Sequence, residues 1–380
     1  YWGLERVGED ARLMREAGIN IARIGEFAWC RMEPEEGRFT LDWLHDCVET
    51  LARHGIQVLM CTPTAAPPAW LIQRYPDTLL VGADGARAVH GGRRHYCPTS
   101  PTYRGHVERI VEHLTREMSR HANVVAWQID NELGHEAGAC HCESCQARFQ
   151  AWLKERYGSL EELNRRWGTG FWSMDYSAWE QLRLGSQGWL SPSRLLDSRR
   201  FWSDMWIEFA RHQAAIIRRN HPGAQVTTNG MGPIYDAVDY YRLFSGLDVA
   251  SDDLYFDIGT MDTDIAAMNV YRSLKPGQRY WITETGSGAL DYGRPPRPEQ
   301  LRSRRRSLHD LPLADLPLGP GTGAAGHPRA LRAPRAPPQV GASDELHSAI
   351  VRLGREGKAL LGTFRAGVAE LPPYGVCIVR

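Results

Sequence analysis

Residues 103–132 have the sequence YRGHVERIVEHLTREMSRHANVVAWQIDNE. Apolar residues recur every three or four positions from Tyr103 to His121, which predicts a helix with one buried face. The apolar run Val124–Ile129 follows directly and is short, as in a strand buried on both faces. Polar residues, Asp-Asn-Glu at 130–132, end this strand. A helix followed by a buried strand is the repeating unit of a parallel α/β fold, and residues just after such a strand lie at its carboxyl edge.

The same helix-then-strand order recurs five more times along the chain. The pairs of helix and strand are 9–17 with 19–24, 41–53 with 56–61, 201–220 with 225–228, 236–245 with 249–251, and 265–274 with 280–283. Six units in about 285 residues predict the α/β class and a (β/α)8 barrel. A doubly wound parallel sheet is the second interpretation.

The net charge and the mean hydropathy limit the classes of partner that the chain is expected to bind. The 380 residues carry 45 Lys and Arg against 45 Asp and Glu, so the formal net charge is zero. The long-range field that attracts proteins to nucleic acid or to anionic membrane is therefore absent. No window reaches the roughly 18 consecutive apolar residues of a membrane helix, and the mean hydropathy is −0.43. We expect neither a nucleic acid nor a membrane as partner.

Composition changes sharply near residue 292. All thirteen Trp lie between Trp2 and Trp281, and residues 293–363 contain no aromatic side chain. Residues 293–342 hold nine Arg and ten Pro against three acids, a composition typical of a low-order segment. We therefore divide the chain into a barrel domain at 1–292, a low-order segment at 293–342 and a small remainder at 343–380. Because a GC-rich gene yields such a run when it is translated out of frame, residues 300–341 are a candidate frameshift product.

Carboxylates follow two of the predicted strands. Glu132 ends the segment 124–132, and Glu284 comes directly after the strand 280–283. A carboxylate at the end of a buried strand is costly unless it is paired or functional. Two of them facing each other across a barrel mouth are the basic equipment of a glycosidase. From the residues alone, structural ion pairs at the barrel rim are the favoured interpretation, because such pairs are common at strand ends.

Five segments of the barrel domain form a recognisable set. They are RIGEFAW (23–29), EPEEG (33–37), TPTAAPPAWL (62–71), RHYCP (94–98) and WQIDNE (127–132). Each alone is a weak signal, but together and in this order they resemble glycoside hydrolase family 42, the bacterial and archaeal β-galactosidases. The resemblance extends over residues 1 to about 292.

The resemblance implies a retaining hydrolase that cleaves terminal β-D-galactosyl residues by double displacement. By position, Glu132 is similar to the family's acid/base and Glu284 to its nucleophile. Asn131 resembles the neighbour that binds the sugar 2-hydroxyl group. The remaining matches to the sugar pocket are Arg23, Arg93 and Tyr255, together with Tyr292 in place of a family Trp.

Measured against the family, parts of the barrel are missing. The six predicted strands match strands two to seven, strand one would precede the chain, and strand eight is not recognisable. Residues 371–376 resemble the end of the family's small C-terminal β domain, so a remnant of that domain is expected. The family's middle domain, which is linked to trimer formation, is not visible, although a homotrimer is possible by resemblance. An alternative to an active enzyme is therefore an impaired, truncated barrel that at most binds sugar.

Four cysteines suggest a metal site. Cys140, Cys142 and Cys145 lie within six residues, and Cys97 is remote in sequence. Thiols this close form disulfides only with strain, whereas four thiolates satisfy a tetrahedral Zn²⁺ ion. Some members of the resembled family carry such a structural zinc in this loop, and these four cysteines match it. Reduced thiolates fit a cytoplasmic protein. A zinc module for nucleic acid is disfavoured by the flanking acids Glu136 and Glu143.

Overall fold

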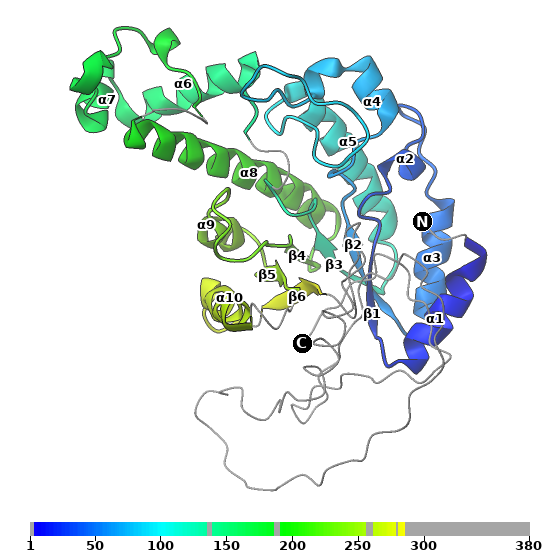
Figure 1. Ribbon diagram of the computed structural model, residues 1–380. Helices are drawn as coiled ribbons and strands as arrows, with labels where there is room; N and C mark the ends of the chain where they lie inside the picture. The colour runs from blue at the N-terminus through cyan, green and yellow to red at the C-terminus, as the bar shows by residue number, and fades with distance from the viewer. Residues whose placement is uncertain (1–3, 135–138, 186–190, 256–260, 279, 286–380) are drawn as a thin grey trace, which may run out of the picture.

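The computed structural model describes residues 4–134, 139–185, 191–255, 261–278 and 280–285. Within them lie six strands, one for each predicted helix–strand unit (Figure 1). The strands are β1 (Ile21–Ile24), β2 (Gln57–Cys61), β3 (Val124–Gln128), β4 (Gln225–Thr227), β5 (Ser251–Asp253) and β6 (Trp281–Glu284).

All paired strands are parallel and follow one another in chain order. β1, β2, β3 and β4 form one ladder, and β5 pairs with β6. A parallel bridge between Gly230 and Asp252 links the end of β4 to β5. A doubly wound sheet reverses its strand order at a switch point, and this order has no reversal among the described strands. The strand order is that of a (β/α)8 barrel.

Each strand is preceded by a helix on the outside of the sheet (Figure 1). These helices are α1 (Val7–Glu16), α3 (Asp42–Arg53), α5 (Pro101–Met118), α8 (Pro192–Asn220), α9 (Tyr240–Ser245) and α10 (Met261–Leu274). Four more helices lie in the segments between strands: α2 (Trp29–Met32), α4 (Ala69–Arg74), α6 (Glu143–Tyr157) and α7 (Leu160–Trp167).

Local capping explains where two helices differ from their predicted bounds. α8 begins at Pro192 because the Ser191 hydroxyl accepts a hydrogen bond from the backbone N–H of Arg194. α9 begins only at Tyr240, after the predicted start at residue 236, because the carboxylate of Asp239 caps its first turn. Proline, serine and aspartate at these positions are recognisable signals of a helix start.

Two layers of apolar side chains hold the barrel together. The inner layer contains Ile21, Leu59, Ala126, Val249 and Trp281, which pack in one cluster although they come from strands at both ends of the sheet. Since residues of β1 and β6 meet in this cluster, the sheet curves toward closure. A larger outer layer fills the space between strands and helices, with Trp127, Tyr103 and Phe209 among its buried members.

A third cluster lies apart from the barrel core. Phe149, Leu153, Leu163 and Phe201 from α6, α7 and α8 are buried around Cys97, Cys140 and Cys145. Figure 1 shows α6 and α7 beyond the first turns of the long helix α8. The cysteines therefore belong to a small subcore next to the barrel.

Several predictions lie outside the described residues. These are Tyr292, the low-order segment 293–342 and the remainder 343–380, so the predicted domain boundary, the possible frameshift and the β-domain remnant stay predictions. Among the described residues, none of the helices has the length and apolarity needed to cross a bilayer.

Candidate active site

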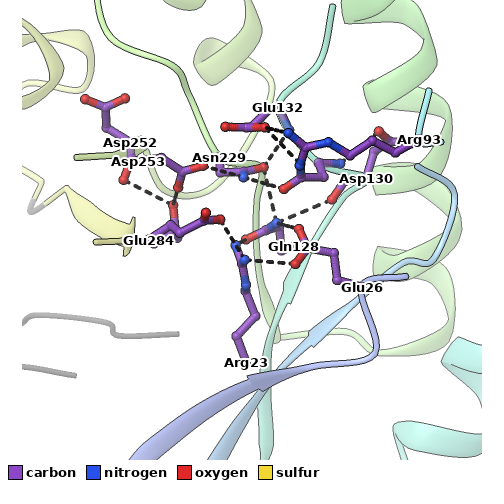
Figure 2. A network of polar contacts seen from close by, with 12 residues as sticks. Arg23, Glu26, Arg93, Gln128, Asp130, Glu132, Asn229, Asp252, Asp253 and Glu284 are labelled. Atoms are coloured by element: carbon purple, nitrogen blue, oxygen red, sulfur yellow. Dashed lines mark hydrogen bonds and ion pairs between the residues drawn. The ribbon is translucent and has the colours of Figure 1, made fainter. Parts of the chain in front are cut away.

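Polar side chains from at least five strands gather at the carboxyl end of the sheet (Figure 2). Each lies in the last residues of a strand or just after it, where a parallel barrel exposes its strand ends to one mouth. Their positions are Arg23 and Glu26 at β1, Gln128 to Glu132 at β3, Asn229 at β4, Asp253 at β5 and Glu284 at β6.

Arg23 joins the two ends of the described sheet. Its Nη2 atom donates to Oε2 of Glu284 and to Oε2 of Glu26, each at 2.9 Å. Its Nη1 atom donates to Oε1 of Gln128 at 3.0 Å. The guanidinium is almost completely buried, with 2% of the side chain exposed, whereas 21% of the Glu284 side chain is exposed. The buried guanidinium of Arg23 thus holds the carboxylate of Glu284, whose other side is accessible to solvent.

Asn229 connects the Glu132 segment to β5. Its Nδ2 atom donates to Oδ1 of Asn131 at 2.7 Å and to Oδ2 of Asp253 at 2.6 Å. Its Oδ1 atom accepts from the backbone N–H of Glu132 at 2.8 Å and from Nε2 of Gln128 at 3.2 Å. Asp253 in turn accepts from the hydroxyl of Thr283, the residue before Glu284, at 3.1 Å. A continuous chain of hydrogen bonds links the two predicted catalytic carboxylates, and it runs from Glu132 through Asn131, Asn229, Gln128 and Arg23 to Glu284.

Two arginines and an amide hold Glu132. Its Oε2 atom lies 3.2 Å from Nη2 of Arg93 and 3.3 Å from Nη2 of Arg94, and it accepts from Nδ2 of Asn131 at 3.1 Å. Arg94 also donates to the backbone carbonyl oxygens of Asn131, at 2.7 Å, and of Glu132. Arg94 is fully buried and Arg93 is about one-third exposed. Arg94 thus fixes the backbone as well as the carboxylate, while Arg93 faces the open side.

The backbone around Glu132 is strained. Arg94, Asp130 and Glu132 all have positive φ, at 54°, 52° and 44°. Such left-handed conformations are unfavourable for residues with a side chain and persist only where surrounding contacts enforce them. Asp130 supplies those contacts: its carboxylate accepts from the hydroxyls of Thr64 at 2.6 Å and Tyr96 at 2.9 Å and from the backbone N–H of Asn131. Strain held by a buried network is typical of functional sites.

Burial of so many acids changes their proton affinity. Desolvation raises the pKa of Glu26 to about 7, against the attraction of Arg23 and with added repulsion from Glu284 and Glu132. Burial likewise raises the pKa of Asp253 well above its ordinary value, and the charges of Glu284 and Glu132 add to the effect. Burial disfavours the charge of Arg23, yet Glu26 and Glu284 together raise its pKa. Arg23 therefore stays charged, while some of its acidic neighbours hold protons near neutrality.

Most of the residues predicted from the sequence meet here. Arg23, Arg93, Asn131, Glu132 and Glu284 belong to one network. Tyr255 lies two residues beyond the end of β5 and is half-buried. Tyr292 lies outside the described residues.

The network also contains residues that the sequence analysis did not assign. They are Glu26, Arg94, Gln128, Asn229 and Asp253. Four of them lie in or just after a predicted strand, so the strand-end argument, applied to all six strands, would have identified them. Arg94 follows no strand, and the sequence showed only that it begins the RHYCP segment directly after Arg93.

The four predicted metal ligands form a second, separate cluster. Sulfur atoms of Cys97, Cys140, Cys142 and Cys145 all lie within 4.8 Å of one another. The separations are 3.3 Å for Cys97–Cys145, 3.5 Å for Cys142–Cys145 and 3.8 Å for Cys97–Cys142. These separations exceed a disulfide bond, and the cysteines are free thiols. Four sulfurs in this arrangement are compatible with a metal ion.

A match to a model of a protein family shows to which family the chain belongs. A model of glycoside hydrolase family 42, described as beta-galactosidase, matches residues 1–311. The chain belongs to this family. The fold prediction is thereby confirmed, because the chain aligns closely with solved structures of family 42 enzymes, which are (β/α)8 barrels.

Curated relatives and solved structures agree with this assignment. A β-galactosidase of Thermus thermophilus is 42% identical over an alignment of 314 positions, which covers 77% of this chain and 48% of that protein. The β-galactosidase structure from Halorubrum lacusprofundi is 35% identical with a TM-score of 0.73, covering 78% of this chain and 47% of that one. The structure from Bacillus circulans sp. alkalophilus is 34% identical with a TM-score of 0.73, covering 79% and 46%. The chain thus spans about half the length of these relatives.

The position of Asn229 at the centre of the network leads to a testable expectation. Asn229→Ala removes four hydrogen bonds and leaves their buried partners unsatisfied, at a cost of about 1–3 kcal/mol each in isolation. Because the partners can partly re-pair, we expect the free energy of unfolding to fall by at least about 2 kcal/mol. Urea unfolding followed by circular dichroism measures this loss.

Asn220→Ala is the matched control. Asn220 ends α8, is half-buried, and binds the hydroxyl of Thr115 and the carboxylate of Glu112. We expect Asn220→Ala to lose about 1 kcal/mol, because water can replace these bonds at a half-buried position. Equal losses in the two variants would contradict a special role for Asn229.

Proposed function

We propose that the chain is a retaining glycoside hydrolase that removes terminal β-D-galactosyl residues, with Glu284 as nucleophile and Glu132 as acid/base. One observation carries the proposal. Glu284 ends β6 and Glu132 follows β3, so both lie at the same mouth although they are 152 positions apart in the sequence. Their carboxylates belong to one hydrogen-bond network, which runs through Asn131, Asn229, Gln128 and Arg23. Membership of the β-galactosidase family supplies the substrate class.

In the first step, a carboxylate oxygen of Glu284 attacks the anomeric carbon of the galactoside. The glycosidic C–O bond breaks, and Glu132 gives its proton to the departing oxygen. Arg23 holds Oε2 of Glu284 at 2.9 Å, which fixes the orientation of the attacking carboxylate. A galactosyl ester of Glu284 and a free alcohol or sugar result.

In the second step, Glu132 acts as a base. It removes a proton from a water molecule whose oxygen attacks the anomeric carbon, and the ester bond to Glu284 breaks. Galactose leaves with its anomeric configuration retained. Arg94 and Asn131 hold Glu132 in place during both steps, because they bind its carboxylate and Arg94 also binds its backbone.

Two variants separate the roles of the carboxylates. Glu284→Gln removes the nucleophile, so we expect loss of turnover on every β-galactoside. Glu132→Gln removes the proton donor, which contributes about 10²–10⁴-fold for alcohol leaving groups. We expect Glu132→Gln to form the galactosyl ester quickly from a dinitrophenyl galactoside, whose leaving group needs no proton. A pre-steady-state burst of dinitrophenolate measures this difference.

Glu208→Gln is the control variant. Glu208 lies on α8 and pairs with Arg104 and Arg148, away from the barrel mouth. Its activity should match that of the unmodified chain. If the unmodified chain hydrolyses no β-galactoside but binds galactose, the impaired barrel is the correct interpretation and the enzyme proposal is wrong.

We also propose that the four cysteines hold a structural Zn²⁺ ion. A zinc–sulfur bond of about 2.3 Å gives sulfur–sulfur separations of about 3.8 Å in a tetrahedron, near those observed for Cys97, Cys142 and Cys145. Four protein ligands leave no position for substrate, so the ion would brace the α6–α7 subcore and take no part in hydrolysis. The free thiols support a reducing compartment, and we propose the cytoplasm.

Metal analysis tests this second proposal. We expect one zinc ion per chain, lost in Cys142→Ser together with a lower thermal unfolding temperature. Cys47→Ser serves as control, because Cys47 is a half-buried free cysteine on α3 outside the cluster. Zinc retained at full occupancy by Cys142→Ser, or no zinc in the unmodified chain, would contradict the assignment.

An exposed aromatic pair supports self-association, and we propose the trimer implied by the family resemblance. Phe171 and Trp172 are 64% and 66% exposed, with ring centroids 4.8 Å apart. Trp172 and Ser173 both have positive φ, so an unfavourable backbone presents these rings to the surface. Two exposed rings side by side form a small apolar patch, and apolar patches on the surface are candidate contact sites.

Light scattering measures the assembly. We expect a mass of about three chains for the unmodified protein and a smaller mass for Phe171→Ala with Trp172→Ala. Val89→Ala, which changes a 78% exposed side chain elsewhere, should leave the mass unchanged. A monomeric unmodified chain would contradict the proposed assembly.

A further inference from the structure

Glu26 is a buried acid that the double displacement does not use. It lies two residues after β1 and is 6% exposed. The turn that brings it back toward Arg23 requires Gly25, whose φ is 93° and whose added Cβ would lie 3.2 Å from the sulfur of Met60. The chain therefore bends at a glycine directly after the strand and places a carboxylate beside the buried arginine.

Glu26 and Glu284 bind the same atom. Nη2 of Arg23 donates to Oε2 of each carboxylate, both at 2.9 Å (Figure 2). Gln128 closes a ring of hydrogen bonds with Arg23 and Glu26. Its Oε1 atom accepts from Nη1 of Arg23 at 3.0 Å, and its Nε2 atom donates to Oε1 of Glu26 at 3.4 Å. The two hydrogens of Nη2 are thus divided between a carboxylate at the open mouth and one that is sealed beneath it.

Charges of both signs face Glu26. Arg23 on β1 and Arg93 before α5 are positive, and Arg94 adds a third cation at Glu132. Glu284 on β6 and Glu132 after β3 are negative when ionised, and the buried acid Asp253 on β5, whose pKa is also raised, belongs to the same network. Burial outweighs the attraction of Arg23 and raises the pKa of Glu26 to about 7, so Glu26 changes its protonation near neutrality.

We propose that Glu26 is a positioning residue for the nucleophile: it competes with Glu284 for Nη2 of Arg23, and its proton decides how much of that cation Glu284 receives. The proposal rests on the proposed function, since it takes Glu284 as the nucleophile. Glu26 itself touches neither substrate nor reacting atoms.

The competition between Glu26 and Glu284 for Arg23 predicts the direction in which the turnover rate changes with pH. When Glu26 is protonated, Arg23 pairs mainly with Glu284. The stronger ion pair makes the Glu284 carboxylate less reactive toward the anomeric carbon. When Glu26 is ionised, the Arg23 charge is divided, and an additional negative charge faces the oxocarbenium-like transition state. The turnover rate therefore rises as the pH increases through the pKa of Glu26.

The pH profile of kcat tests this prediction. We expect the unmodified chain to show an ionisation near pH 7 whose deprotonated form is the faster one. Glu26→Gln imitates the protonated acid permanently, so kcat should fall about tenfold with KM nearly unchanged, and the ionisation near pH 7 should disappear. Glu26→Asp keeps a titrating carboxyl group and should retain an ionisation. Glu208→Gln should keep the full profile of the unmodified chain.

A purely structural role would give a different result. Glu26→Gln would then lower the stability, or kcat at every pH alike, and the ionisation near pH 7 would remain. That outcome overturns the proposal. Loss of the ionisation in Glu26→Asp as well as in Glu26→Gln would also overturn it, because a carboxyl group would then still be present without the effect.

A second measurement needs no activity and no folded Glu26 variant. Carbon-13 labelling of the glutamate carboxyl groups in the full chain allows their titration by NMR and separates them from Asp252 and Asp253. In Glu284→Gln, Glu26 should lose its proton at a lower pH, because one repelling charge is gone and Arg23 is no longer shared between two charges. An unchanged titration overturns the competition, whereas absence of galactoside hydrolysis in the unmodified chain contradicts only the proposed function.

Discussion

The ion pair between Arg23 and Glu284 joins the first described strand to the last. A buried guanidinium is costly unless carboxylates and hydrogen bonds compensate it, and Arg23 obtains them from Glu26, Gln128 and Glu284. These partners lie on β1, β3 and β6, so the cation can be satisfied only if the sheet curves until its ends approach. The packing of Ile21 against the cluster that contains Trp281 follows the same curvature. Closure of the fold and orientation of Glu284, the proposed nucleophile, therefore depend on one interaction.

Much of this arrangement was predictable because it depends on local periodicity. Short apolar runs predict buried strands, and amphipathic segments predict helices. The six helix–strand units, and from them the barrel, could therefore be predicted from the sequence. Glu132 and Glu284 were identifiable because a charge directly after a buried strand needs an explanation. The cysteine cluster was identifiable because three thiols within six residues have few stable arrangements.

The remaining part of the site depends on contacts between distant segments. Arg93 and Arg94 are adjacent, and only the positive φ of Arg94 and its bonds to the backbone of residues 131 and 132 show which one is buried. Asn229 follows an ordinary strand, and its importance comes from four partners at residues 128, 131, 132 and 253. Periodicity carries no information on such pairings, since they are fixed by how the strands align around the barrel.

The site gathers more acids than cations, and this imbalance has a chemical use. A positively charged transition state is stabilised by a site with surplus negative charge, yet surplus charge in a buried space destabilises the empty protein. Protons on Glu26 and Asp253 reconcile the two demands, because burial raises the pKa of both acids. The hydrogen bonds of Asn229 and Thr283 to Asp253 keep that acid in place whichever form it takes. In the proposed mechanism, the acids beneath the mouth act as a reserve of negative charge whose size depends on pH, while Arg23 and Arg94 hold Glu284 and Glu132 in place.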